Sequence, residues 1–358
     1  MRVLALVTDA FGGRGGIAMY NRQALEAMAS APDLTSLVVL PRVVMEESYL
    51  VPDGITWVAS AAGGLSAFVT AFLRQLFAPV DVIYCGHLHL LPLAMIIKVL
   101  RRKPLILQVH GIEVWQPRRP SATRWLSYVD SIWCVSRYTR DRMNAWACLP
   151  STRYTIIPNT IRLEQFGLAP RNPALVARYG LDEARVLLTL ARLDSRERYK
   201  GIDEVLQVFP ELLSRNPDLI YLIAGSGDDQ PRLQAKAEAL GVAERVRFVG
   251  YVTEGDKADV LRLADVFVMP GRGEGFGIVY LEAMACGVPV IGSRLDGSQD
   301  ALADGQLGTL VDPDQPEQLV VAIREALLLP RQIPPSLSRF AWPSFQSRVH
   351  DAVGSFSH

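Results

Sequence analysis

The residues with the clearest chemical potential lie in GRGEGFGIVYLEAMACGVPV, which runs from Gly271 to Val290. Glu274 and Glu282 stand eight residues apart in this stretch, with a Gly-rich segment between them. The sequence predicts a helix from about Phe276 to Ala285, because Gly and Pro end the run before the next strand. Helix N-termini bind anions through their unpaired N–H groups, and carboxylates bind hydroxyl groups. The stretch therefore predicts a site for a ligand that carries both phosphates and hydroxyls.

The spacing of the two glutamates restricts the class of ligand that the site could bind. Eight residues of helix rise ~12 Å, which is comparable with the span from a ribose across two phosphates to a second sugar. Glu274 could bind sugar hydroxyls and favour the positive charge that develops at an anomeric carbon, and Glu282 could accept hydrogen bonds from the ribose. The pair therefore predicts a nucleotide sugar as ligand.

Two cations follow an earlier strand of the same half of the chain. Arg192 and Lys200 lie in ARLDSRERYKG, directly after the predicted strand Val186–Leu190. Cations beside a helix start suit a diphosphate and can neutralise its charge as it departs, so no metal ion and no cofactor is expected. Surface charge is the competing interpretation, above all for Arg196 and Arg198.

The first half of the chain offers two further strand ends. FGGRGGIAMYN follows the predicted strand Val3–Val7 and contains Gly15 and Gly16, which would let the backbone approach a ligand closely. His110 follows the strand Leu105–Val109, although a lone histidine is more often structural than catalytic. The glycines do not form G-x-G-x-x-G, which argues against a nicotinamide-dependent oxidoreductase.

These residues can form one site only if the fold brings the ends of their strands together. Aliphatic strands alternate with helical stretches along the chain, which predicts parallel sheets covered by helices and ligands at the carboxyl ends of the strands. At 358 residues the chain suits two domains. We predict an α/β fold of two facing Rossmann-like domains, residues 1–167 and 168–335, with a C-terminal helix in 336–358 packing on the first.

Charge and composition restrict the class of protein. The chain has 37 basic and 37 acidic side chains, which excludes a strongly basic nucleic-acid binder, and its hydrophobic content of 49% suits a globular core. The segment from Lys98 to Arg142 contains ten basic residues and three acidic residues. This cluster is either a solvated face or a patch that meets an anionic membrane surface.

The location expected from the sequence is the cytoplasm. The opening MRVLALVTDA lacks the apolar core and cleavage site of a signal peptide. The four cysteines lie among apolar residues without metal-ligand spacing, which suits a reducing compartment. Peripheral attachment to the inner face of the cytoplasmic membrane is the accompanying hypothesis.

The motifs together resemble the retaining glycosyltransferases of family 4, which have the GT-B fold. The similarity extends over nearly the whole chain and includes GGRGG, the HG at His110, IIPNTIRLEQF, AGSGDD, VRFVGYV and GEGFGIVYLEAMACGVPVI. The last segment matches the family's E-x7-E motif at Glu274 and Glu282. One departure is LDGSQD, where Asp300 stands in place of the glutamate that commonly follows a Gly-Gly pair.

The resemblance implies roles for particular residues. His110 and Glu274 would act at the transferred sugar, and the other residues would bind the donor without a metal. The donor residues so implied are Gly15, Gly16, Arg192, Lys200, Gly250, Tyr251, Val252, Gly275, Phe276, Gly277, Ile278 and Glu282.

The activity that the resemblance implies is transfer of a hexose from a GDP- or UDP-linked sugar to a saccharide or lipid-linked acceptor, with retention. Mannose from GDP-mannose is the leading expectation. A nucleotide-sugar epimerase on the same fold and a non-catalytic GT-B partner subunit stay open as alternatives.

Overall fold

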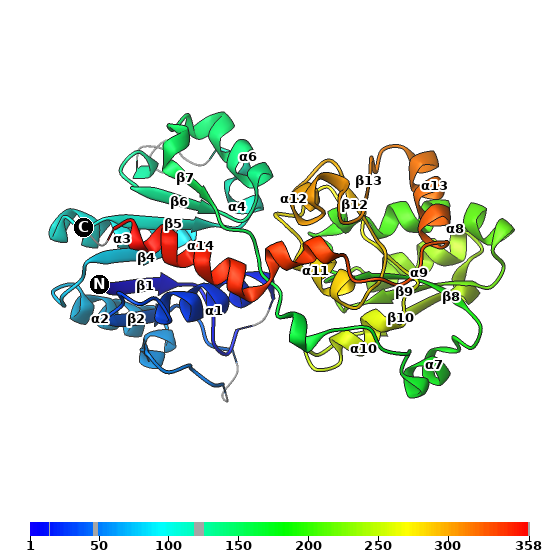
Figure 1. Cartoon of the computed structure of the whole chain (residues 1–358), viewed down its shortest axis with the longest axis horizontal. Coiled ribbons are helices and arrows are strands. Elements are labelled where there is room, and N and C mark those ends of the chain that lie inside the picture. The colour runs from blue at the N-terminus through cyan, green and yellow to red at the C-terminus, as the bar shows by residue number, and fades with distance from the viewer. Residues whose placement is uncertain (14, 46–48, 118–124, 357–358) are drawn as a thin grey trace. The chain divides into compact units, whose positions relative to one another are not determined.

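The computed structural model describes residues 1–13, 15–45, 49–117 and 125–356 (Figure 1). The chain forms two compact units. One comprises Met1–Thr160 together with Trp342–His358, and the other comprises Ile161–Ala341. The chain therefore enters the second unit at Ile161, somewhat before the predicted boundary at 167, and its C-terminal helix belongs to the first unit.

The first unit contains a seven-stranded parallel sheet in the order β3-β2-β1-β4-β5-β6-β7. The crossover from β1 through the long helix α1 to β2 and the return to β4 give the doubly wound arrangement. The strands are β1 (Arg2–Val7), β2 (Ser36–Pro41), β3 (Ile55–Trp57), β4 (Val82–Cys85), β5 (Leu105–Val109), β6 (Ser131–Cys134) and β7 (Tyr154–Ile156). The main helices are α1 (Gly16–Ala29), α2 (Leu65–Gln75), α3 (Leu91–Arg101), α4 (Ile112–Trp115), α6 (Arg137–Ala147) and α14 (Trp342–Gly354).

Alternation along the strands divides the core between the two faces of this sheet. Leu4 and Leu6 of β1 belong to one buried cluster with Phe68 of α2 and Leu91 of α3, so α2 and α3 cover the same face. The long apolar run that begins at Leu88 is therefore a crossover helix packed on a sheet. Within the described residues no helix is long and apolar enough to span a bilayer.

The second unit contains a six-stranded parallel sheet in the order β10-β9-β8-β11-β12-β13. Its strands are β8 (Arg185–Leu190), β9 (Leu219–Ala224), β10 (Val246–Gly250), β11 (Val266–Val268), β12 (Val290–Ser293) and β13 (Thr309–Val311). Its helices include α7 (Pro173–Tyr179), α8 (Ile202–Arg215), α9 (Gln230–Ala239), α10 (Lys257–Arg262), α11 (Ile278–Ala285), α12 (Ser298–Ala301) and α13 (Pro316–Ala326). Both units are thus Rossmann-like, as predicted. Each sheet collects the carboxyl ends of its strands at a single edge.

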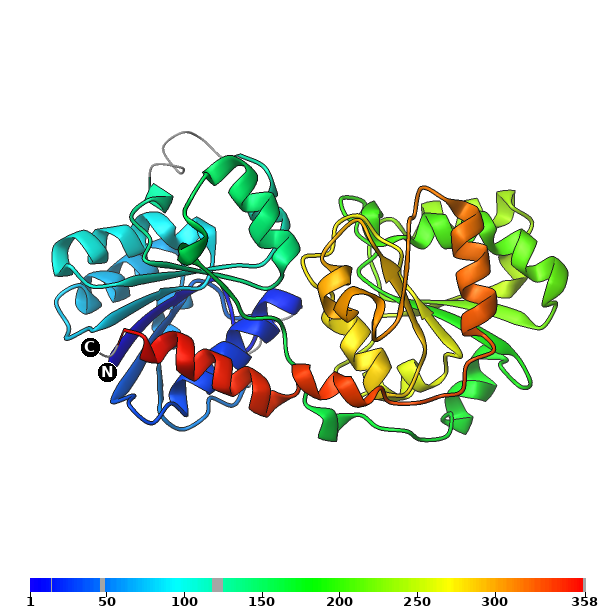
Figure 2. The ribbon, with the colours of Figure 1, turned by 45° about the horizontal axis from the view of Figure 1, so that its top comes forward.

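The C-terminal helix α14 lies along α1 of the first unit (Figures 1 and 2). Its inner face buries Phe345, whose ring meets the ring of Tyr20 edge-on at 5.9 Å between centroids. At the end of α1, the His350 side chain contacts the Ala27 carbonyl at 2.9 Å. The helix therefore closes one side of the first unit with both apolar and polar contacts.

We predict that Phe345→Ala destabilises the first unit by about 3 to 5 kcal/mol, because it removes a fully buried aromatic ring and leaves a cavity. Denaturant unfolding followed by circular dichroism measures this loss. Ser347→Ala on the exposed side of the same helix is the matched control and should change stability by less than about 0.5 kcal/mol. A loss below about 1 kcal/mol for Phe345→Ala would show that α14 does not stabilise the unit.

Candidate functional site

The residues predicted to bind a donor in the second unit all follow strands at the carboxyl edge of its sheet. Arg192 and Lys200 follow β8, Gly250 ends β10, and Glu274 lies between β11 and α11. The fold therefore brings these segments to one edge although they are up to 90 positions apart in the sequence.

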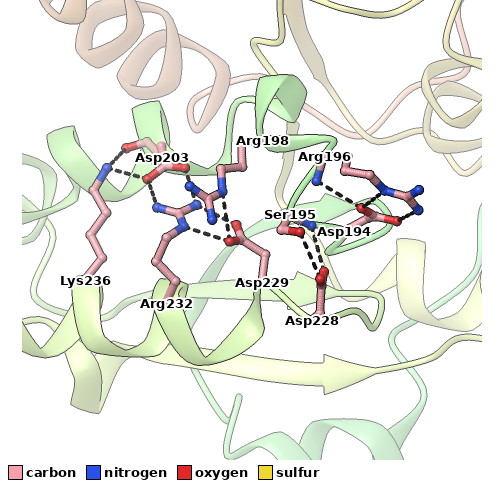
Figure 3. A network of polar contacts seen from close by, with 9 residues as sticks. All are labelled: Asp194, Ser195, Arg196, Arg198, Asp203, Asp228, Asp229, Arg232 and Lys236. Carbon is pink, nitrogen blue, oxygen red and sulfur yellow. Dashed lines mark hydrogen bonds and ion pairs between the residues drawn. The ribbon is translucent and has the colours of Figure 1, made fainter.

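The loop after β8 is held by carboxylates that follow β9 (Figure 3). Asp228 accepts hydrogen bonds from the Ser195 amide at 2.7 Å and from the Ser195 hydroxyl at 2.8 Å. Asp229 pairs with Arg198 at 3.0 Å and with Arg232 of α9 at 2.6 Å. Within this network Arg198 therefore has a structural partner.

Arg192 projects from the start of the same loop. Its guanidinium pairs with Glu197, yet 73% of its side chain is exposed. Most of the guanidinium side chain is therefore accessible to a ligand, whereas Glu197 is largely buried. Arg192 is thus placed to bind an anion.

Lys200 and Glu274 bind each other. The Lys200 ammonium donates to Glu274 Oε1, and both side chains are nearly buried. Burial is the largest effect and lowers the pKa of Lys200, but Glu274, Tyr199 and Glu197 together outweigh burial and raise it. The ammonium also lies 5.3 Å from the centre of the Tyr199 ring. The groups assigned to diphosphate and sugar are therefore direct neighbours.

Glycines allow the Glu274 loop to pack closely on its surroundings. A Cβ on Gly273 would come within 2.3 Å of the Tyr199 ring. Gly277 has φ of 85° and a Cβ there would come within 2.4 Å of the Tyr280 ring. Any larger residue at these two positions would push the loop away from the aromatic rings.

Helix α11 begins at Ile278, later than the predicted start at Phe276. The left-handed backbone of Gly277 cannot continue a helix, so Glu274 precedes the helix on an extended loop. The ~12 Å rise of an eight-residue helix therefore does not describe the span between the two glutamates, because only the residues from Ile278 onward are helical. Phe276 is buried and its ring packs at 5.5 Å from Phe340, so only its backbone could serve a ligand. Gly275, Gly277 and Ile278 stay partly exposed.

Glu282 lies inside α11 and pairs with Lys257, the first residue of α10, at 2.9 Å. Lys257 also pairs with Glu254 at 2.8 Å. Burial raises the pKa of Glu282 even though Lys257 opposes the shift. Glu282 Oε2 is buried and has no hydrogen-bond partner among the described residues. A buried acceptor without a donor is suited to a hydroxyl group of a ligand.

The segment predicted to meet the base, Gly250 to Val252, leaves the end of β10 through a left-handed glycine. The Gly250 carbonyl accepts from the Gly225 amide at 2.8 Å. Tyr251 is 60% exposed, and three residues after it comes Glu254, the second partner of Lys257. Because Lys257 forms ion pairs with both Glu254 and Glu282, it connects this segment to Glu282.

Lys257 and Asp296 are site residues that the sequence reasoning missed. Asp296 is completely buried, and its Oδ2 accepts from the Glu274 amide at 2.9 Å. Lys257 stands in a polar stretch that is typical of a solvated turn, and Asp296 lies four residues before Asp300 in LDGSQD. Pairing across elements cannot be read from either local sequence.

The residues predicted in the first unit also lie at the carboxyl edge of its sheet. Gly15 caps α1 with φ of 88°, and both Gly15 and Gly16 are exposed with open space where a side chain would be. His110 follows β5, and its Nε2 contacts the Gly86 carbonyl at 3.0 Å. Burial lowers the pKa of His110, so the neutral ring donates through Nε2 and leaves Nδ1 as an acceptor.

The structure describes only part of the predicted basic cluster between Lys98 and Arg142. Arg118, Arg119 and Arg124 lie outside the described residues. Lys98 pairs with Asp130, which removes it from an exposed patch.

Two family patterns match the chain. Residues 14–165 match the family described as Glycosyltransferase Family 4, and residues 175–340 match Glycosyl transferases group 1. Over 271 residues the chain is 31% identical to a GDP-mannose-dependent alpha-(1-6)-phosphatidylinositol monomannoside mannosyltransferase of Mycobacterium tuberculosis, with 72% of this chain and 69% of the relative aligned. The chain belongs to the family 4 glycosyltransferases.

Other relatives of this glycosyltransferase are matched over less of their length. An enzyme of the same description from Mycolicibacterium smegmatis is 38% identical over 260 residues, which cover 67% of this chain and 66% of the relative. A phosphatidyl-myo-inositol mannosyltransferase of Mycobacterium tuberculosis is 36% identical over 173 residues, 48% of this chain and 43% of the relative. The chain thus spans between two fifths and about two thirds of these two relatives.

Solved glycosyltransferase structures share the fold of this family member. Anabaena Alr3699/HepE in complex with UDP and glucose superposes with a TM-score of 0.78 at 18% identity, covering 99% of each chain. The lipopolysaccharide outer core galactosyltransferase WaaB has a TM-score of 0.74 at 17% identity, again over 99% of each chain. The predicted GT-B fold class is therefore confirmed.

We predict that Lys257→Met destabilises the second unit by about 3 to 5 kcal/mol at pH 8, because Glu282 would be buried without its cation. The raised pKa of Glu282 would rise further, so the carboxyl takes up a proton in the folded state before the unfolded state does. Stability of the variant should consequently fall as pH rises. Urea unfolding at pH 5 and pH 8 measures both effects. The double variant Lys257→Met, Glu282→Gln is the control and should regain stability and lose the pH dependence; a single variant as stable as the parent at pH 8 contradicts the pairing.

Proposed function

We propose that this protein transfers a hexose, with mannose from GDP-mannose as the leading candidate, to a lipid-linked or saccharide acceptor with retention of configuration. The relatives from Mycolicibacterium smegmatis and Mycobacterium tuberculosis are both named GDP-mannose-dependent alpha-(1-6)-phosphatidylinositol monomannoside mannosyltransferase. Their names support GDP-mannose as the donor and a lipid-linked acceptor. The GT-B neighbours support only the fold.

The observation that carries the proposal is the buried contact between Lys200 and Glu274. Transfer from a nucleotide sugar breaks the bond between the anomeric carbon and the diphosphate. Positive charge then develops on the sugar and negative charge on the leaving oxygen. A carboxylate beside an ammonium matches this separation of charge.

Each remaining residue has a role in this proposal. Arg192 and Lys200 stabilise the departing diphosphate, so transfer proceeds without a metal ion. Glu274 binds the sugar hydroxyls, and Glu282 accepts from the ribose through its unpartnered Oε2. The amides of Gly275, Phe276, Gly277 and Ile278 and the backbone of Gly15 and Gly16 bind the phosphates. Gly250, Tyr251 and Val252 bind the base. His110 accepts, at Nδ1, a hydrogen bond from a hydroxyl group of the transferred sugar.

Incubation with GDP-mannose, UDP-glucose, UDP-galactose or UDP-N-acetylglucosamine and a lipid extract tests the proposal. We expect sugar transfer to a lipid, most from GDP-mannose and undiminished by EDTA. Conversion of a nucleotide sugar without an acceptor would instead identify an epimerase. Absence of both transfer and nucleotide-sugar binding would indicate a non-catalytic subunit.

We predict that Arg192→Ala lowers kcat/KM for the donor by roughly ten- to a hundred-fold, since a hydrogen bond to a charged group contributes about 1.5 to 3 kcal/mol. Stability should fall to some extent because the largely buried Glu197 loses its cation, so activity is measured at a temperature at which the variant is folded. Arg324→Ala, an exposed arginine on α13, is the control for loss of charge and should keep full activity. Full transfer by Arg192→Ala would remove Arg192 from the diphosphate site.

A lipid acceptor also requires contact with a membrane, and the first unit exposes a suitable surface. We call it the α2–α3 face. Both helices cover the same side of the sheet, and their outer sides carry large apolar residues at helical spacing. The exposed residues are Leu65, Val69, Leu73 and Phe77 on and after α2, and Ile96, Val99 and Leu100 on α3.

The charges around the α2–α3 face favour an anionic bilayer as its partner. Asp81 is the only acidic residue between Asp53 and Glu113. Arg74 and Arg102 are exposed beside the apolar residues, and each basic residue near an anionic surface contributes about 1 kcal/mol. An apolar face with a basic rim is typical of interfacial membrane binding.

We predict that Leu73→Glu with Phe77→Glu lowers binding to vesicles containing phosphatidylglycerol at least tenfold, because burial of each large apolar side chain contributes about 1.5 to 3 kcal/mol. Sedimentation with these vesicles measures the change, and salt should weaken the binding of the parent protein. Leu328→Glu, at a side chain that is 84% exposed in the second unit, is the control and should bind as the parent does. Equal binding of the parent to phosphatidylcholine vesicles would contradict the role of charge.

A further inference from the structure

Asp296 lies in the turn between β12 and α12 and is completely buried. Its two carboxyl oxygens accept from two different backbone segments. Oδ2 accepts from the Glu274 amide at 2.9 Å, and Oδ1 accepts from the Ser298 amide at 2.9 Å. One side chain thus connects the Glu274 loop to the first turn of α12.

The backbone of the Glu274 loop and the backbone of the turn that contains Asp296 also contact each other directly, beside the Asp296 carboxyl. The Gly297 amide donates to the Glu274 carbonyl at 2.8 Å. A Cβ on Gly297 would lie 2.1 Å from the Gly275 carbonyl oxygen, so the contact leaves no room for a side chain. Both the amide and the carbonyl of Glu274 are therefore held by the turn that contains Asp296.

We propose that Asp296 is a positioning residue for Glu274: its carboxylate holds the loop in the geometry for sugar transfer, and protonation of this carboxylate breaks one of its two amide hydrogen bonds, loosens the connection between the Glu274 loop and α12, and slows transfer. This inference rests on the proposed function, since it concerns the carboxylate assigned to the transferred sugar. Asp296 itself is buried behind Glu274 and acts only through it.

Several polar groups face this carboxyl. Glu274 comes from the loop before α11 and is balanced by Lys200 of the 3-10 turn Arg198–Lys200. From α11, the Tyr280 hydroxyl donates to the Met269 carbonyl at 2.7 Å and accepts from the Ser298 hydroxyl at 2.9 Å. Burial raises the pKa of Asp296 to about 7, while hydrogen bonds from Ser298 and from the Glu274 amide oppose the rise and the charge of Glu274 adds to it.

The sign of the pH effect follows from these contacts. Above the pKa both oxygens accept amide hydrogens, and below it one oxygen carries a proton and loses this ability. With the pKa at about 7, the ionised fraction falls about tenfold between pH 8 and pH 6. No histidine belongs to the second unit, and burial lowers the pKa of His110, the histidine assigned to the transferred sugar. The diphosphate of a nucleotide sugar stays fully ionised over the same range.

The test is the pH profile of sugar transfer from pH 6 to pH 8 for the parent protein and two variants. Asp296→Asn keeps the shape of the side chain but accepts through one oxygen only, like the protonated acid. We expect its kcat/KM to be about tenfold below the parent at pH 8 and nearly independent of pH. Asp182→Asn, at an exposed position in the same unit, is the matched control and should follow the parent profile.

Ser298→Ala provides a second measurement that needs only the loss of one hydroxyl. The Ser298 hydroxyl donates to the Tyr280 hydroxyl at 2.9 Å beside Asp296 and, with the Ser298 amide, lowers the pKa of this carboxyl, so its removal should move the inflection to higher pH. A parent-like profile for Asp296→Asn overturns the inference, and so does an unmoved inflection for Ser298→Ala if Asp296→Asn does not fold. No transfer by the parent at any pH would overturn the proposed function itself, so the two failures are distinguishable.

Discussion

A buried carboxylate must be matched by a cation or by N–H donors, and this requirement organises the second unit. Glu274, Glu282 and Asp296 are all buried, and their partners come from other elements. Lys200 precedes α8, Lys257 begins α10, and the Ser298 amide begins α12. The three carboxylates therefore join loops from different parts of the sheet edge, and the candidate site exists only while these pairs are intact.

Close backbone contact is the second condition for the same site. Gly273 lies against the Tyr199 ring and Gly297 lies against the Gly275 carbonyl, at separations that exclude a side chain. These contacts bring the loop after β8, the loop after β11 and the turn after β12 within hydrogen-bond distance. The ion network of Asp228 and Asp229 then holds the Arg192 loop from its other side (Figure 3).

The first unit has a different balance of interactions. Its sheet is closed on one face by α1 and α14, where Phe345 is fully buried, and it is covered on the other by α2 and α3. The outer sides of α2 and α3 remain apolar, which is uncommon for a surface without a partner. The second unit is thus rich in ion pairs at its sheet edge, whereas the first unit has an apolar outer face on α2 and α3.

The sequence alone determined the parallel α/β class, the positions of most central strands and the residues at their carboxyl ends, because buried strands are short apolar runs and parallel strands share one functional edge. It missed β2, β3, β7 and β13, and the three residues in each of the last three strands give little periodic signal. It also placed the start of α11 too early, since the left-handed backbone at Gly277 depends on packing against Tyr280. Only the tertiary structure decided that Lys257 neutralises Glu282 and that Asp296 holds Glu274, because these partners are 25 and 22 residues apart and their burial is created by the fold.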